Sequence, residues 1–152
     1  MREEIVKNLI EKTPGISYNE IVRKTGLSNG VVSHYLTKLI KIEKIEKEGT
    51  SRGKYFGKNI PKKDRIMITL LRNKTNNDVF RYIMENSKSN ELVNANQIAR
   101  KIKKSGSTIS VSLKILQQNN IIERMIMNKS SKLTNDIGYK ISNKKIWTTY
   151  FV

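Results

Sequence analysis

Two runs of short polar side chains follow predicted helix starts, and their chemistry suits hydrogen bonding to another molecule. Short residues at the start of a helix let its backbone approach a surface, where their amides and hydroxyls reach polar groups. In nucleic acid these groups are base edges and phosphates. The first run consists of Ser28, Asn29, Gly30, Val31, Ser33 and His34.

Individual residues of the first run favour readout of double-stranded DNA. Asn29 has an amide that can form two hydrogen bonds with adenine, and Val31 suits the methyl group of thymine. Lys38 lies further along the same predicted helix, where a phosphate contact is expected. The alternative is that Ser28 only caps the helix and Asn29 is a solvated first-turn residue.

The second run is richer in hydroxyl groups, which suit phosphate and sugar contacts and equally suit an ordinary helix start. It consists of Ser105, Ser107, Thr108 and Ser110, with Lys114 one turn later. Basic residues precede it at Arg100, Lys103 and Lys104, either as the flank of a DNA groove or as a solvated charged face.

Two predicted turns also carry basic residues. Arg52 and Lys54 stand at the tip of a predicted hairpin, from which an arginine can enter a narrow minor groove. Lys129 and Lys132 lie in a later polar loop and suit the phosphate backbone.

The same inventory argues against catalysis and metal binding. His34 is the single histidine, and the chain has no cysteine, so the usual metal-ligand sets cannot form. Carboxylates such as Asp64, Asp78 and Asp136 are scattered, without paired spacing. We therefore expect a binding protein with no cofactor, and not an enzyme.

The charge balance favours a polyanionic partner. The chain has 152 residues and a formal net charge of +17, from 30 basic and 13 acidic residues. Residues 1–61 hold 12 basic and 7 acidic side chains, whereas residues 62–152 hold 18 and 6. Compositional bias and an anionic membrane surface are weaker alternatives. No apolar run is long enough to span a membrane and no signal-peptide pattern is present, so a cytoplasmic, nucleoid-associated protein is expected.

Periodicity and capping patterns predict the elements that position these residues. The first part should form a helix over 2–12, two helices capped by Ser17 and Ser28, and a hairpin of strands at 44–48 and 54–56. Val32, Leu36 and Leu39 form the predicted buried row of the third helix.

The later part is predicted to repeat this order after a helix over 62–72 packed between two units. Its helices should be capped by Thr75, by Asn94, and by Ser105 or Ser107. Strands are expected at 121–127 and 139–141, with Gly138 ending the loop between them. The tail, 146–152, is aromatic and β-branched, a composition that allows it to add a strand.

A shift of 77 residues aligns 19–47 with 96–124 without a gap. The shift superposes polar and capping residues as well as apolar ones, including Ser28 on Ser105 and Leu39 on Leu116. Shared helical periodicity alone would match only apolar positions, so a duplicated module is the better interpretation.

Residues 14–21, 26–30 and 34–39 resemble archaeal winged helix-turn-helix transcription regulators related to the arsenic-responsive and multiple-antibiotic-resistance repressor families. Some of those regulators carry two such units in tandem. The resemblance is close over 14–57 and looser over 75–142, where Lys103 and Lys104 replace the Gly-Leu of the turn.

The resulting prediction is a mainly α fold with small β-hairpin wings (α+β), in two tandem winged helix-turn-helix domains at 1–61 and 75–152, joined by 62–74. The expected function is transcription regulation through double-stranded DNA, with recognition helices in the major groove and basic wings on the minor groove and phosphates. A replication initiator or DNA-packaging protein and a winged-helix interaction scaffold are the alternatives. A homodimer and a small-molecule effector remain open.

Overall fold

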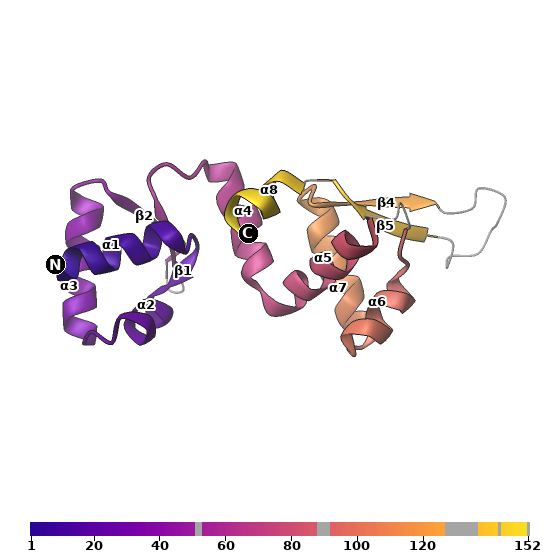
Figure 1. The fold of residues 1–152 in the computed structure, drawn as a ribbon, viewed down its shortest axis with the longest axis horizontal. Helices are drawn as coiled ribbons and strands as arrows, with labels where there is room; N and C mark the ends of the chain where they lie inside the picture. Colours follow the sequence, from indigo (N-terminus) through magenta and orange to yellow (C-terminus); the bar gives the residue numbers. More distant parts are fainter. Residues whose placement is uncertain (51–52, 88–91, 127–136, 143, 152) are drawn as a thin grey trace. The chain divides into compact units, whose positions relative to one another are not determined.

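The chain divides into two compact units, Met1–Thr69 and Leu70–Val152 (Figure 1). The structure is a computed structural model. It describes residues 1–50, 53–87, 92–126, 137–142 and 144–151. In those ranges no helix is both long and apolar enough to cross a membrane.

Unit 1 consists of three helices and a small antiparallel sheet. Its elements are α1 (Arg2–Lys12), β1 (Ile16–Ser17), α2 (Tyr18–Thr25), α3 (Asn29–Lys41), β2 (Ile45–Glu48) and β3 (Lys54–Gly57). The strand order is β1-β3-β2, and Ile16 of β1 pairs with Tyr55 of β3. The three predicted helices and the hairpin are confirmed, whereas β1 was not predicted.

Local chemistry explains where the helices of unit 1 begin and end. The side chains of Ser17 and Ser28 accept hydrogen bonds from the backbone N–H groups of Glu20 and Val31, each at 3.3 Å. These bonds satisfy donors that a helix start leaves unpaired. Gly26 ends α2 in the left-handed conformation with φ of 70°, which glycine adopts without steric cost.

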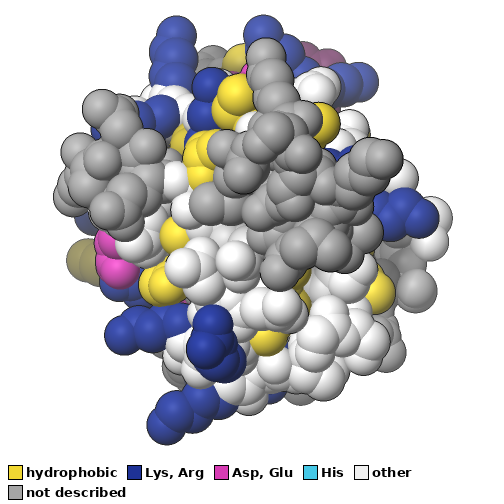
Figure 2. Space-filling view, turned by 90° about the vertical axis from the view of Figure 1, so that its right-hand side faces the viewer, with side chains coloured by type: hydrophobic (Ala, Val, Ile, Leu, Met, Phe, Trp, Pro, Cys, Tyr) yellow, Lys and Arg dark blue, Asp and Glu magenta, His cyan; other side chains and the backbone are white. Residues whose placement is uncertain are grey.

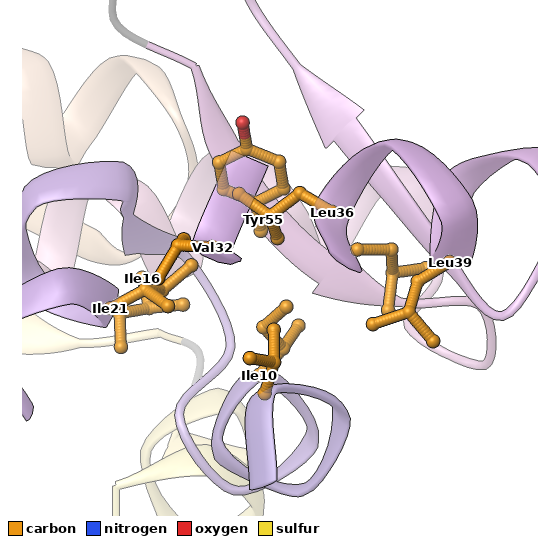
Figure 3. Packing of buried hydrophobic residues seen from close by; sticks show 9 residues of the cluster. Ile10, Ile16, Ile21, Val32, Leu36, Leu39 and Tyr55 are labelled. Atoms are coloured by element: carbon orange, nitrogen blue, oxygen red, sulfur yellow. The ribbon is translucent and has the colours of Figure 1, made fainter. Parts of the chain in front are cut away.

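The core of unit 1 lies where α1, α2 and α3 meet the sheet. The predicted row of α3 is buried and packs with Ile10 of α1 and Tyr55 of β3 (Figure 3). The labelled side chains of Figure 3 point toward a common centre. Because one side of α3 is held in this core, its opposite side faces solvent.

The division between the units falls within α4 (Lys62–Arg72), the predicted connecting helix. Unit 2 then contains α5 (Lys74–Ser87), α6 (Ala95–Ile102), α7 (Gly106–Gln118), β4 (Ile122–Ile126), β5 (Ile137–Ile141) and α8 (Lys144–Tyr150). Strands β4 and β5 pair antiparallel. Helix α7 buries Ile109, Leu113 and Leu116.

Helices α6 and α7 of unit 2 begin and end 77 residues after α2 and α3 of unit 1. Helix α6 matches α2 in length, eight residues, and α7 matches α3, thirteen residues. The turn after each long helix contains one residue of positive φ, Glu43 at 60° and Asn120 at 59°. Ile16 pairs with Tyr55 in unit 1, and Val93 forms a bridge with Tyr139 in unit 2.

Two predictions for unit 2 were wrong in detail, and the structure decides between the two proposed caps of α7. Thr75 lies inside α5 and does not cap it, because the side chain of Asn73 accepts the backbone hydrogen bond from Asn76 at 3.1 Å. Gly138 lies within β5 and pairs with Met125. Of the two proposed caps for α7, Ser105 holds the position and accepts from the N–H of Thr108.

The tail is a helix and not a strand. In α8, Ile146 is buried, and the rings of Trp147 and Phe151 stack with centroids 5.1 Å apart. Trp147 also contacts the ring of Phe80, at 5.3 Å. Residues four apart are neighbours on a helix, so this contact to α5 and the aromatic stacking favour a helix over the β-propensity of the segment.

Candidate nucleic-acid interface

The outward side of α3 carries the first predicted run. Ser33 and His34 are exposed on the helix, Val31 is half-buried, and Lys38 is exposed near the other end. The cap Ser28 and the first-turn residues Asn29 and Gly30 are exposed as well. The buried row lies on the opposite side, so these residues lie on the solvent-facing side of α3, and most of them are polar.

Tyr18 holds the start of α3, and sequence reasoning did not identify it. Its hydroxyl donates to the backbone carbonyl of Asn29 at 2.9 Å and lies 2.9 Å from the hydroxyl of Ser33. The ring packs against the core of unit 1. Tyr18 therefore joins the first residue of α2 to the first turn of α3. The signal for it in the sequence is a bulky phenol at the first position of the preceding helix.

Lys38 has a protein partner in addition to its predicted role. Its Nζ lies 2.7 Å from the Glu3 carboxylate of α1. The hydrogen bond with Lys38 lowers the pKa of Glu3, and the bond with Glu3 raises the pKa of Lys38. Both side chains are partly exposed, so a phosphate can compete for this ammonium group.

A groove of about 500 Å³ lies between the start of α2 and the β2–β3 hairpin. Its charged side chains among the described residues are Lys47 and Lys54, and none is acidic. A Cβ at Gly53 would overlap the side chain of Lys47, so glycine leaves room for this lysine on the hairpin. The predicted Lys54 is half-buried at this groove, whereas the predicted Arg52 lies outside the described residues. The groove suits an anion.

The two acidic residues of β2, Glu46 and Glu48, both pair with Arg65 of α4. Its Nη1 lies 2.6 Å from Glu48 and 3.1 Å from Glu46, and its Nε donates to the carbonyl of Ile60 at 3.0 Å. The guanidinium also lies over the ring of Phe56, 5.5 Å from the centroid. Sequence reasoning missed this cluster because the partners are far apart along the chain.

The pKa directions agree with this geometry. The hydrogen bond from Arg65 lowers the pKa of Glu46. Burial opposes the charged form of Arg65, but hydrogen bonds to Glu46 and Glu48 outweigh it and raise the pKa of Arg65. Arg65 therefore pairs with both carboxylates, which leaves less uncompensated negative charge on the hairpin.

The corresponding surface of unit 2 lies on α7. Its hydroxyls bond to one another, since Ser105 Oγ lies 2.8 Å from Thr108 Oγ1 and 3.2 Å from Ser107 Oγ. Ser110 and Lys114 are exposed on the same helix. The structure thus brings the second predicted run together on one exposed surface.

The basic residues before α7 are exposed too. Arg100 lies in α6, and Lys103 and Lys104 form the turn that follows. Lys103 has φ of 62°, so it adopts the left-handed conformation that Gly26 has in unit 1. The predicted Lys129 and Lys132 lie outside the described residues. Figure 2 shows one face with Lys and Arg side chains around its margin and few Asp or Glu side chains.

Three helices followed by a β-hairpin, with the polar side of the third helix exposed, define a winged helix-turn-helix domain in unit 1. Residues 4–46, from α1 into β2, match the family model described as winged helix-turn-helix DNA-binding. None of the curated proteins compared with this chain matches it.

Among solved structures, the chain is similar to ScpB from Mycobacterium tuberculosis. The TM-score is 0.35 and the identity 9%, over 93% of this chain and 90% of that one. A similarity this low carries no argument about fold or function.

Proposed function

We propose that this protein is a transcription regulator that binds double-stranded DNA and acts through binding rather than catalysis. In this proposal the exposed side of α3 enters the major groove. The β2–β3 hairpin and its lysine-lined groove contact the adjacent backbone. The observation that carries the proposal is the exposed, tyrosine-held first turn of α3 within a segment that matches a DNA-binding family model.

We also propose that unit 2 is a second winged helix-turn-helix module, so that the chain carries two in tandem. The support is the common 77-residue offset of α6 and α7, of their capping residues, and of the positive-φ residues in the turns. Such agreement in non-repetitive features exceeds what helical periodicity alone produces. The larger excess of basic residues in 62–152 supports a larger share of salt-dependent affinity for this half.

The test is a titration of the full chain with a labelled duplex at two salt concentrations, about 50 and about 200 mM. Sequence selection from a random duplex pool should follow. We expect affinity to fall steeply with salt, because neutralised phosphates release counterions, and we expect one sequence to be enriched. Asn29→Ala should weaken binding to the enriched sequence about tenfold and binding to random duplex much less.

Asn59→Ala is the matched control, since Asn59 is exposed and lies near Ile42, at the end of α3 opposite to Asn29. It should leave both affinities unchanged. Absence of duplex binding at low salt would overturn the proposal and favour an interaction scaffold. Binding without any enriched sequence would favour DNA packaging, and protection of an array of repeats would favour a replication initiator.

A further inference from the structure

The outward side of α7 carries an apolar residue at its centre. Four exposed residues follow one another along this side of the helix at spacings of four, three and four. They lie opposite the buried row and are Ser107, Val111, Lys114 and Gln118. Val111 is 60% exposed. Its neighbours one turn earlier are Ser107 and Thr108, which are polar.

The orientation of Val111 is set from inside unit 2. The next residue, Ser112, is buried, and its hydroxyl donates to the Asn76 side chain of α5 at 2.6 Å. The amide of Asn76 in turn donates to the carbonyl of Leu70 at 3.0 Å. A buried polar pair tolerates little rotation of the helix, because either group would lose its partner. Val111 is therefore held facing outward.

The fold itself offers no reason for valine at this position. A β-branched residue is a poorer helix former than alanine, and an exposed valine gains little from burial. The apolar area is also too small for a protein partner, because the residues around it are hydroxyl-bearing or basic, apart from the half-buried Ile115. Helix α7 has no acidic residue, so nothing on it repels a phosphate backbone.

From these observations we infer that Val111 reads the methyl group of a thymine in the major groove, so that unit 2 recognises bases as well as phosphates. The inference rests on the proposed function. Contact with the thymine methyl is what a small apolar side chain makes on a base edge. Ser107 and Lys114, on either side, contact the flanking backbone.

Unit 1 has His34 at the matching position of α3, at the same 77-residue offset. An imidazole donates and accepts hydrogen bonds, whereas valine does neither. The two exposed helices therefore select different bases, and the preferred duplex is not a simple repeat of one half-site.

The test uses the full chain and the duplex sequence that it enriches. Each thymine in turn is replaced by deoxyuridine, which lacks only the methyl group. For the wild-type chain we expect one or two positions where this replacement lowers affinity about fourfold. This factor corresponds to the free energy of burying one methyl group. In Val111→Ala the same replacements should have no effect, and affinity for the unmodified duplex should fall to the deoxyuridine level.

Two variants separate this inference from its alternatives. Lys114→Ala should weaken binding to every duplex equally and leave the deoxyuridine effect in place. Val111→Thr keeps the shape and one methyl group, so it should retain part of that effect. If deoxyuridine replacement affects wild type and Val111→Ala alike, the inference is wrong while the proposed DNA binding stands. If the wild-type chain binds no duplex, the proposed function itself fails.

Discussion

Unit 1 and unit 2 build the same pair of helices with different residues in the turn between them. Gly26 ends α2 at φ of 70° and Lys103 ends α6 at φ of 62°, so the two turns share the left-handed backbone conformation. Lys103 is strained by this conformation because it has a side chain, whereas Gly26 is not. Buried rows and serine caps agree between the units, whereas the exposed residues differ. Packing and capping therefore determine the backbone, and they leave the exposed surface free to diverge.

The units also hold their exposed helix in different ways. In unit 1 the hydroxyl of Tyr18 bonds to the first turn of α3 from outside the core. Ala95 takes that position in unit 2 and has no hydroxyl, but Ser112 bonds to Asn76 from inside. Tyr35 stands in unit 1 where Ser112 stands in unit 2. Different hydrogen bonds therefore position the exposed surfaces of α3 and α7.

The largest expected effect comes from the core pair Leu39→Ala and Leu116→Ala. Both side chains are buried at matching positions, so each truncation should cost about 2–5 kcal/mol of unfolding free energy. We expect each loss to remain in its own unit, as measured by hydrogen exchange of the α3 and α7 amides. Equal loss of protection in both helices from either variant would show that the units unfold together and would break the comparison.

Arg65→Met should destabilise unit 1 by about 2 kcal/mol, because Arg65 is only 4% exposed and its loss leaves two carboxylates facing each other. The cost is moderated because Glu46 and Glu48 are partly exposed and can take up water. In unit 2, Glu123 stands where Glu46 stands in unit 1, but it pairs with Lys140 of β5, and the side chains of Lys140 and Glu123 are 43% and 54% exposed. Lys140→Met should therefore change stability by less than about 1 kcal/mol in urea unfolding. Equal effects from the two variants would contradict the assignment of Arg65 as a buried anchor.

The smallest effect concerns the turn. Lys103→Gly should stabilise unit 2 by about 0.5–1 kcal/mol by relieving the left-handed conformation, and Gly26→Ala should destabilise unit 1 by about 1 kcal/mol. Lys104→Gly removes the same charge without relieving a positive φ, so it should not stabilise unit 2. Thermal unfolding of the three variants measures these changes in stability. Stabilisation by Lys104→Gly as well would point to charge repulsion in place of backbone strain.

Four helix starts were predictable from the sequence because a cap is local chemistry. Ser17, Ser28, Asn94 and Ser105 all accept the backbone hydrogen bonds expected of them. Asn94 and Gln97 form the full reciprocal capping box. Helical periodicity likewise predicted the buried and exposed sides of α3 and α7, and with them the surfaces that carry most of the candidate residues.

The features that were missed depend on residues distant in the chain. Strand β1 is two residues long, too short for an alternating pattern, and it exists because Ile16 pairs with Tyr55. Arg65 reads as one of several basic residues on a helix until Glu46 and Glu48 are brought beside it. The tail has strand-like composition, but contacts of Trp147 with Phe80 and Phe151 select the helix. Contacts of this kind are not encoded in local propensity.

The aromatic cluster at α8 contains an intrinsic fluorescent probe. Trp147 is the single tryptophan of the protein, and its ring contacts those of Phe80 and Phe151 in unit 2. Its fluorescence on selective excitation therefore follows the state of unit 2, while the tyrosines of unit 1 stay silent in that channel. Events in one half of the molecule are thus visible without any label.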